Sequence, residues 1–344
     1  MMKLYSKAAL AAATLLTAVC PALSGQEKDR GVVELSVCFM REKPGYEEEL
    51  GNQALMGTPV EILGKEGYWL KIKSPEPYVA WVNEMAVTLM DSLEVKSYIA
   101  DPKYICVAKQ SEIWTSPSSK SLRVCDLVQG DIVRIWYNDK GRPVKAGGCL
   151  GVILPSGRKG YVRAEDLQDF SSWAGSRQAT ADNVVNTAMS FNGAPYMWGG
   201  ASSKAFDCSG LTRTAFLLNG VLLPRNASQQ VHSGIEVNID ELKAALAVPD
   251  APVTSFGALQ KGDLLFFGRK GADGRERITH VGLYIGGGRL IHSSHMVRIN
   301  SLNPAEPDYY TGSTRLLKAR RMCAPDGTPY TEPLIKDSPY YFSK

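Results

Sequence analysis

The first half of the chain repeats one short strand pattern, which restricts this part of the molecule to a small β architecture. Gly57-x-x-Val60-x-Ile62 recurs as Gly130-x-x-Val133-x-Ile135, and Trp81-Val82 recurs as Tyr161-Val162. Short strands at this spacing, separated by Gly, Pro and charged residues, are typical of a sandwich or barrel. We therefore expect two copies of one β module.

The pattern changes after Leu167, where helix signals precede strand signals. Thr180 can cap a helix, and a second helix is expected to begin near Asp207. Apolar runs between Asp263 and Ser293 then predict strands. Helices followed by an antiparallel sheet indicate an α+β domain.

Composition excludes several classes of function. The 344 residues carry a formal charge of +4, with 44% hydrophobic and 22% charged residues, which is ordinary for a globular protein. The sequence has no dense Lys/Arg stripe, so we expect no nucleic-acid partner. No cysteine or histidine cluster has the spacing of zinc ligands, and we expect neither a metal nor a cofactor. The six cysteines after Cys20 are widely spaced, which favours free buried thiols for most of them.

The N-terminus has the pattern of a secretory signal peptide. A basic start is followed by an uncharged run at 8–19, and small residues precede a cleavage position before Gly25. The run is too short to span a bilayer, so we expect residues 1–24 to be removed and the protein to be exported, to the periplasm or the extracellular space. Lipid attachment at Cys20 is the less favoured alternative, because Val19 is bulkier than the residue such processing prefers.

Cys208 falls in the first turn of the helix expected near Asp207. Unpaired backbone N–H groups and the helix dipole stabilise a thiolate there, so we expect a lowered thiol pKa and a nucleophilic role. The alternative is a buried core cysteine, the commoner fate of a free thiol. A catalytic role requires a base nearby.

Three of the four histidines fall in one expected β-hairpin around Gly286–Gly288. A three-residue loop places His280 and His292 on one face as diagonal neighbours. A two-residue loop places His280 opposite His295 and turns His292 to the other face, because one step of register swaps faces. Either pair can supply a general base and an orienting residue for a thiol. The alternative is two solvated strand histidines.

Four ordered motifs lie between Asp182 and Leu317. They are Pro195-Tyr196-Met197-Trp198-Gly199-Gly200, Phe206-Asp207-Cys208-Ser209-Gly210, Gly262-Asp263-Leu264-Leu265-Phe266-Phe267 and Thr279-His280-Val281-Gly282-Leu283-Tyr284-Ile285-Gly286, followed by Ile291-His292-Ser293-Ser294. Together they resemble the NlpC/P60 cysteine peptidases of bacterial cell walls. The resemblance implies that Cys208 is the nucleophile, His280 the base and His292 the orienting residue. It also selects the three-residue turn and leaves His295 as a surface residue.

The same resemblance implies roles for residues around the nucleophile. Tyr196 and the backbone N–H of Cys208 would flank the position where the oxyanion forms. Asp207 and Ser209 would line the substrate cleft. Trp198 is interpreted as a packed structural aromatic.

The β modules resemble bacterial SH3 domains. The expected architecture is therefore multidomain, with two small all-β SH3-like barrels followed by an α+β, papain-like catalytic domain. The expected boundaries are 1–24 for the signal peptide, 25–97 and 98–168 for the two SH3-like domains, 178–320 for the catalytic domain and 321–344 for a tail without an assigned role.

This domain order resembles that of γ-D-glutamyl-L-diamino acid endopeptidases of the dipeptidyl-peptidase VI type. The resemblance implies a murein peptide substrate, L-Ala-γ-D-Glu-diamino acid with a free amino terminus, and hydrolysis of the amide after γ-D-glutamate. In these enzymes the first β module supplies an acid and a tyrosine to the amine pocket, and Glu49 and Tyr78 are the nearest matches here. Asn226 stands where Asp is common, in a cleft segment that also contains Ser228.

Two other functions remain open from the sequence. An N-acetylmuramoyl-L-alanine amidase would use the same nucleophile on a different bond, and product masses would separate the two activities. A non-catalytic wall-binding protein would use the β modules alone, and the complete set of Cys208, His280 and His292 argues against it. We expect a monomer.

Overall fold

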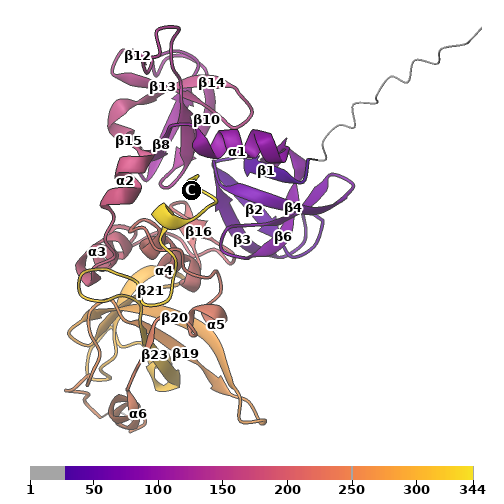
Figure 1. Ribbon diagram of the computed structural model, residues 1–344. Helices are drawn as coiled ribbons and strands as arrows, with labels where there is room; N and C mark the ends of the chain where they lie inside the picture. Colours follow the sequence, from indigo (N-terminus) through magenta and orange to yellow (C-terminus); the bar gives the residue numbers. More distant parts are fainter. Residues whose placement is uncertain (1–27, 249–250, 344) are drawn as a thin grey trace, which may run out of the picture.

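The computed structural model describes residues 28–248 and 251–343. The expected signal peptide, with Cys20, lies outside the described residues. Figure 1 shows three bodies that surround the C-terminal end of the chain. Within the described part, no helix has the length and apolar character needed to cross a membrane.

The first body is a seven-stranded antiparallel sheet with strand order β3-β2-β6-β5-β4-β1-β7. Its elements are β1 (Arg30–Val33), β2 (Val37–Arg41), β3 (Leu50–Leu55), β4 (Pro59–Glu66), β5 (Trp69–Lys73), β6 (Val79–Asn83), η1 (Glu84–Ala86) and β7 (Val87–Met90), followed by helix α1 (Ser92–Ala100). These strands follow the two-residue alternation of buried and exposed side chains that a sheet requires. In β5, for example, Leu70 and Ile72 are buried while their neighbours are half-buried.

The second body repeats the strand order of the first. Its elements are β8 (Lys103–Cys106), β9 (Gln110–Trp114), β10 (Arg123–Val128), β11 (Ile132–Ile135), β12 (Lys145–Ala146), β13 (Cys149–Ile153), β14 (Lys159–Arg163), η2 (Ala164–Asp166) and β15 (Leu167–Asp169). The order β10-β9-β14-β13-β11-β8-β15 matches the first sheet strand for strand once β12, which pairs beside β13, is set aside. The repeated sequence pattern therefore corresponds to a repeated topology.

The glycine of each repeat makes the same turn. Gly57 and Gly130 have φ angles of 82° and 99°, which favour glycine. Each backbone N–H donates to a carbonyl of the preceding strands, Gly57 to Val33 and Gly130 to Cys106, both at 2.9 Å. A Cβ atom on Gly57 would lie 2.2 Å from the carbonyl oxygen of Ile132, so the two modules also touch at this turn.

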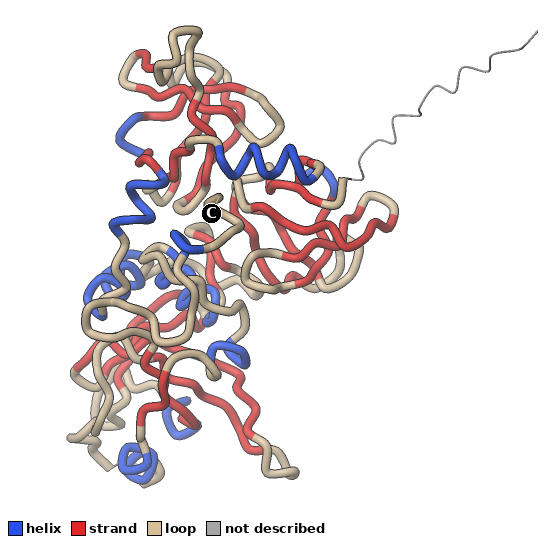
Figure 2. The backbone as a smooth tube through the Cα atoms, in the orientation of Figure 1, coloured by secondary structure: helices blue, strands red, loops and turns tan. Residues whose placement is uncertain are grey.

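The third body combines helices with a six-stranded antiparallel sheet, as expected (Figure 2). Its elements are α3 (Ala181–Ser190), β16 (Ala201–Ser202), β17 (Ala205–Phe206), α4 (Cys208–Leu217), α5 (Ala227–Gln230), β18 (Ile235–Val237), α6 (Asp240–Leu246), β19 (Leu264–Lys270), β20 (Glu276–Gly286), β21 (Arg289–Ser294), β22 (Met296–Ser301), η3 (Thr311–Arg315) and β23 (Leu316–Arg321). The sheet order is β18-β23-β19-β20-β21-β22. Helix α4 packs against β20 and β21.

The Thr180 cap and the helix start near Asp207 that the sequence predicts are both confirmed. The Thr180 hydroxyl accepts from the N–H of Asn183, and the Asp207 carboxylate accepts from that of Gly210. The edge strands β18 and β22, and β23 beside β18, were not predicted from the sequence. In β18, for example, only one of three residues is buried, so little apolar periodicity marks this strand.

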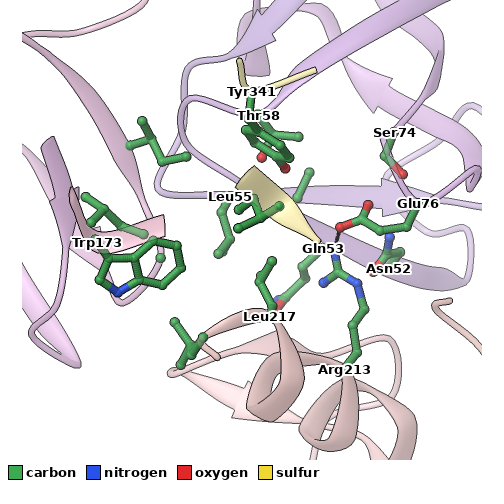
Figure 3. A pocket seen from close by; sticks show the side chains of 16 residues that line it. Asn52, Gln53, Leu55, Thr58, Ser74, Glu76, Trp173, Arg213, Leu217 and Tyr341 are labelled. Atoms are coloured by element: carbon green, nitrogen blue, oxygen red, sulfur yellow. Dashed lines mark hydrogen bonds and ion pairs between the residues drawn. The ribbon is translucent and has the colours of Figure 1, made fainter. Parts of the chain in front are cut away.

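The C-terminal tail and the linker helix meet at the junction of the three bodies. Helix α2 (Phe170–Ser176) follows the second sheet, and η4 (Ile335–Asp337) lies in the tail. One buried apolar cluster joins them to both sheets and to α4, through Val37, Leu55, Ile105, Val128, Ile132, Phe170, Trp173, Ala174, Leu217, Leu222, Ile335 and Tyr341. Figure 3 shows Trp173, Leu217 and Tyr341 converging on this junction from different elements.

Candidate active site

Cys208 is the first residue of α4, at the helix N-terminus that the sequence predicted. Asp207 is the N-cap, with extended backbone, and its carboxylate accepts from the Gly210 N–H at 2.7 Å. The Cys208 sulfur accepts hydrogen bonds from the backbone N–H groups of Ser209 and Val281. The Cys208 sulfur therefore lies between α4 and strand β20.

The expectation of a lowered thiol pKa is wrong. Burial raises the pKa of Cys208 to about 11, and the negative charge of Asp207 raises it further. The two backbone N–H groups and the Arg225 guanidinium act in the opposite direction but do not compensate. Desolvation of a thiolate therefore outweighs the helix N-terminus, and Cys208 is a neutral thiol at neutral pH.

The hairpin brings His280 and His292 together, as the longer-loop register predicts. His280 Nε2 and His292 Nδ1 are 2.8 Å apart, and Leu283 pairs with Ile291. The turn itself differs from the predicted loop, because Arg289 pairs with Gly286 and the register shifts between Tyr284 and Gly286. A β-bulge, rather than a three-residue loop, therefore sets the faces.

A hydrogen-bond chain behind the histidines fixes their tautomers. Asn300 on β22 donates its side-chain N–H to the Asp308 carbonyl at 2.6 Å, which turns its Oδ1 toward His292 Nε2 at 2.9 Å. His292 therefore carries its proton on Nε2 and accepts at Nδ1 from His280 Nε2–H. The lone pair of His280 is left on Nδ1. Sequence reasoning missed Asn300, because only the β21–β22 pairing brings it beside His292.

Both histidines are neutral at pH 7. Burial lowers the pKa of His280 to about 3 and that of His292 to about 4. The Tyr310 ring packs edge-on against His292, with ring centroids 4.7 Å apart, and shields the pair from water. His295 is exposed in the turn between β21 and β22, consistent with a surface residue.

Tyr196 lies beside the nucleophile. Burial and the neighbouring Cys208 raise the pKa of Tyr196 to about 12, so its hydroxyl is a donor at neutral pH. The Tyr196 N–H donates to the His295 carbonyl at 3.3 Å, and a bridge to Phe206 holds the segment next to α4. This position fits the donor role expected for Tyr196.

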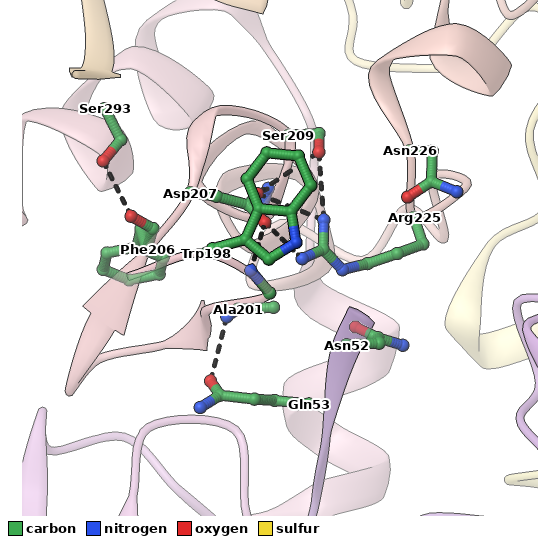
Figure 4. Close-up of polar contacts among 12 residues, drawn as sticks. Asn52, Gln53, Trp198, Ala201, Phe206, Asp207, Ser209, Arg225, Asn226 and Ser293 are labelled. Carbon is green, nitrogen blue, oxygen red and sulfur yellow. Dashed lines mark hydrogen bonds and ion pairs between the residues drawn. The ribbon is translucent and has the colours of Figure 1, made fainter. Parts of the chain in front are cut away.

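Asp207 and Ser209 belong to a buried polar network (Figure 4). Arg225 donates to both carboxylate oxygens of Asp207, at 3.1 and 2.5 Å, and to the Ser209 hydroxyl at 2.9 Å. The Gly199 N–H donates to the same carboxylate at 3.0 Å. Arg225 was not predicted as part of the site. It holds the loop before α4 in place, and the polar atoms expected to line the cleft are engaged in this network.

The first module meets the catalytic domain beside this network. The Tyr78 hydroxyl donates to Glu42 Oε1 at 2.5 Å, and the charges of Asp207 and Arg225 both act on the pKa of Tyr78. Glu49, the acid expected from the sequence, instead accepts from Trp198 Nε1 at 2.7 Å. The structure therefore pairs Tyr78 with Glu42 rather than with Glu49.

Trp198 is not the packed aromatic that the sequence predicted, because 61% of its surface is exposed. Its indole N–H binds the first module instead, and Gln53 of that module accepts from the Ala201 N–H at 2.9 Å. Asn226 is half-buried at the start of α5, next to Arg225, and Ser228 is exposed on the same short helix.

Comparison with known proteins agrees with this geometry. Residues 193–316 match the NlpC/P60 family, and residues 36–88 match the bacterial SH3 domain. Gamma-D-glutamyl-L-lysine dipeptidyl-peptidase from Bacillus cereus is 30% identical over 284 residues, which span 78% of this chain and 76% of that protein. Dipeptidyl-peptidase 6 from Lysinibacillus sphaericus is 30% identical over 275 residues, 78% of this chain and 89% of that protein.

A solved structure shares the fold. The crystal structure of an NlpC/P60 family protein from Bacillus cereus ATCC 10987 superposes with a TM-score of 0.67 at 24% identity, covering 85% of this chain and 99% of that one. A buried thiol at a helix N-terminus, next to a sheet that carries two paired histidines, defines a cysteine peptidase. The chain belongs to the NlpC/P60 family of cysteine peptidases and carries a bacterial SH3 domain ahead of the catalytic domain.

Proposed function

We propose that the protein hydrolyses the amide between γ-D-glutamate and the diamino acid of murein-derived peptides that begin with a free L-alanine. The names of the relatives support this bond, since one is a gamma-D-glutamyl-L-lysine dipeptidyl-peptidase. The observation that carries the proposal is the position of the first module, whose Tyr78 lies near enough to Asp207 and Arg225 for their charges to act on its pKa and donates its hydroxyl to Glu42. An exopeptidase needs such a wall at the end of its cleft.

The proposed amine pocket uses Glu42 and Tyr78. A buried ammonium group needs a carboxylate partner, and the Tyr78 oxygen retains lone pairs after it donates to Glu42. Glu49 is the neighbouring acid, since the Glu42 N–H donates to the Glu49 carbonyl at 3.0 Å. Asn226 supplies no charge, so the pocket depends on the first module for its anion.

In the proposed mechanism the Cys208 sulfur attacks the scissile carbonyl carbon while His280 Nδ1 takes the thiol proton. The oxyanion is stabilised by Tyr196 and the Cys208 N–H. The C–N bond then breaks as His280 returns the proton to the departing amine, which leaves a thioester. Water, activated by the same nitrogen, hydrolyses the thioester, and His292 holds His280 in the productive tautomer.

We further propose the organisation expected from the sequence. The second sheet is a second SH3-like barrel at 98–168, supported by its identical strand order. The first barrel spans 25–97 and the papain-like catalytic domain 178–320. The chain is exported after removal of 1–24 and acts as a monomer.

Mass spectrometry of products from defined wall peptides tests the proposal. Free L-Ala-γ-D-Glu-diamino acid peptides are expected to release the dipeptide L-Ala-γ-D-Glu, and Cys208→Ala is expected to abolish this release. Release of the intact peptide from a muramyl-linked substrate would instead identify an amidase.

A further inference from the structure

We infer that a buried ion pair between Glu76 and Arg213, covered by the C-terminal tail, fixes the distance from the amine pocket to Cys208. The pair would thereby restrict cleavage to the second residue from a free amino terminus. This inference rests on the proposed function and names the residues that position its pocket.

The ion pair joins the two halves of the proposed site directly. Glu76 lies in the loop between β5 and β6, two residues before Tyr78, and Arg213 lies on α4, the helix that begins at Cys208. Glu76 and Arg213 are 8% and 5% exposed, and a guanidinium nitrogen of Arg213 contacts the Glu76 carboxylate. Figure 3 shows Arg213 reaching from α4 to Glu76 across the junction. A rigid helix turn and one ion pair therefore separate the pocket from the nucleophile.

The surroundings of the pair allow little displacement. Leu55, Leu217 and Tyr341 line the small cavity next to it, and Arg213 Nε and Nη1 have no protein partner among the described residues. The cavity also has polar walls, formed by Asn52, Gln53, Thr58 and Ser74. A buried charge still loses much of its stabilisation when its partner moves away. The pair is therefore suited to holding the first module and α4 in one fixed relative position.

The C-terminal tail closes this junction. Its backbone is anchored just after the end of α4. The Leu222 N–H donates to the carbonyl of Pro333 in the tail at 3.0 Å, and the Ile335 N–H of the tail donates to the Gly220 carbonyl at 2.9 Å. Beyond η4 the Tyr340 hydroxyl donates to Glu61 of the first module at 2.6 Å. The tail therefore links the far end of the nucleophile helix to the module that carries Tyr78.

Aromatic side chains of the tail pack beside the ion pair. Tyr341 is buried, makes a side-chain hydrogen bond with Thr58 of the first module, and its pKa responds to the charges of Glu76 and Arg213. The neighbouring Phe342 stacks on Phe170 of α2, with ring centroids 5.0 Å apart and planes inclined by 12°. The tail thus acts as a strap over the pair.

The test compares Arg213→Leu, Glu76→Leu and the double variant with the wild-type protein. The substrates are L-Ala-γ-D-Glu-diamino acid tripeptide, its N-acetyl form, and a peptide with one extra N-terminal alanine. The readouts are kcat and KM for each substrate, the rate of Cys208 alkylation, and Tm. Lys204→Gln is the matched control, because Lys204 pairs with Asp126 of the second module, away from the pocket.

Each single variant is expected to lose at least about tenfold of the preference for the free tripeptide, mainly through KM, with alkylation unchanged. Each also leaves one buried charge unpaired, so Tm falls. The double variant is expected to recover Tm, because apolar residues replace both charges, but not the preference, because no directional contact fixes the register. Lys204→Gln is expected to retain the preference.

Two results would overturn the inference and leave the proposed function standing. One is a preference that recovers together with Tm in the double variant, which would make the pair merely structural. The other is an unchanged preference in all variants. If the wild-type protein itself cleaves all three peptides equally, the proposed amine pocket fails and the inference fails with it.

Discussion

Asn300 sets the direction of the proton chain that ends at His280. It faces His292 Nε2 at 2.9 Å and is itself oriented by the Asp308 carbonyl at 2.6 Å. The chain makes Nδ1 of His280 the basic atom without any charged residue. Buried neutral histidines and a protonated thiol therefore form the resting state, and in the proposed mechanism the proton moves only when the thiol attacks.

Asn300→Leu removes the oxygen that accepts from His292 Nε2–H, so His292 can also adopt the tautomer with its proton on Nδ1. We expect kcat to fall about ten- to hundredfold with little change in KM, as for residues that orient a reacting group. Steady-state kinetics on the free tripeptide measures this. His295→Ala is the control and should be nearly neutral, and equal losses in the two variants would contradict the proton chain.

The lowered histidine pKa values predict acid-sensitive stability. The unfolded chain binds protons at His280 and His292 below about pH 6.5, whereas the folded protein keeps both neutral to about pH 4. This contribution to stability is therefore complete above pH 6.5 and is lost as the pH falls toward 4 and 3. Between pH 7 and pH 5 each histidine should lower the free energy of unfolding by about 2 kcal/mol.

Urea unfolding at pH 7 and pH 5 measures this loss. His292→Gln should lose less stability than the wild-type protein over the same interval, because one buried imidazole no longer titrates. An unchanged difference between the two pH values would assign the acid sensitivity to carboxylates.

At the scale of elements, the bulge in β20 decides which histidines meet. Tyr284 pairs with Leu290, Gly286 pairs with Arg289, and Ile285 is the extra residue. Gly287 and Gly288 form the turn with φ angles of 60° and 75°, which match the primed turns of two-residue hairpins. The hairpin therefore has the two-residue turn of one expected arrangement and the strand pairing of the other, in which His280 and His292 share a face.

Deletion of Gly286 is expected to remove the bulge and leave a regular two-residue hairpin. Because the pairing of Tyr284 with Leu290 does not change, His280 and His292 should still face each other, and activity should persist within about tenfold. Kinetics and a crystal structure of the variant test this. If the deletion instead turns His292 away and activity is lost, the variant has not kept the pairing of Tyr284 with Leu290, and the expectation of a regular hairpin in the same register is wrong.

At the scale of the whole molecule, the first module completes the site. Trp198 and Ala201 of the catalytic domain bind Glu49 and Gln53, and the tail seals the junction from the other side. In the proposed function the substrate end of the cleft is therefore built from two domains, and its selectivity depends on their contact rather than on Cys208.

Acetylation of the substrate amine removes the charge that Glu42 would pair with. Glu42 is exposed in the free protein, and the proposed complex buries it against the peptide. Loss of one partner of a charged pair buried in this way costs about 2 to 5 kcal/mol, so the acetylated or muramyl-linked peptide should react about 30 to several thousand times slower. Glu42→Gln should reduce this preference, with Cys208 alkylation unchanged, because the thiol lies in another domain. Glu49→Gln is the companion variant. A larger loss of preference in Glu49→Gln than in Glu42→Gln would show that Glu49, not Glu42, binds the substrate amine.

The sequence by itself pointed to the residues proposed for catalysis. Cys208 is predicted by a helix start after Asp207, and His280 and His292 by strand alternation around a glycine turn. These are local signals, because capping and periodicity depend on residues a few positions apart. The repeated pattern around Gly57 and Gly130 likewise predicted the repeated topology of the two sheets.

Only the tertiary structure decided the rest. The pairing of Tyr78 with Glu42, the Glu76–Arg213 ion pair and the place of the tail join residues that are 36, 137 and more positions apart. The high pKa of Cys208 has the same origin, because desolvation depends on everything packed around the sulfur and not on the helix turn alone. Contacts between distant segments and the burial they produce leave no periodic trace in the sequence, and they set both the protonation state and the proposed selectivity of the site.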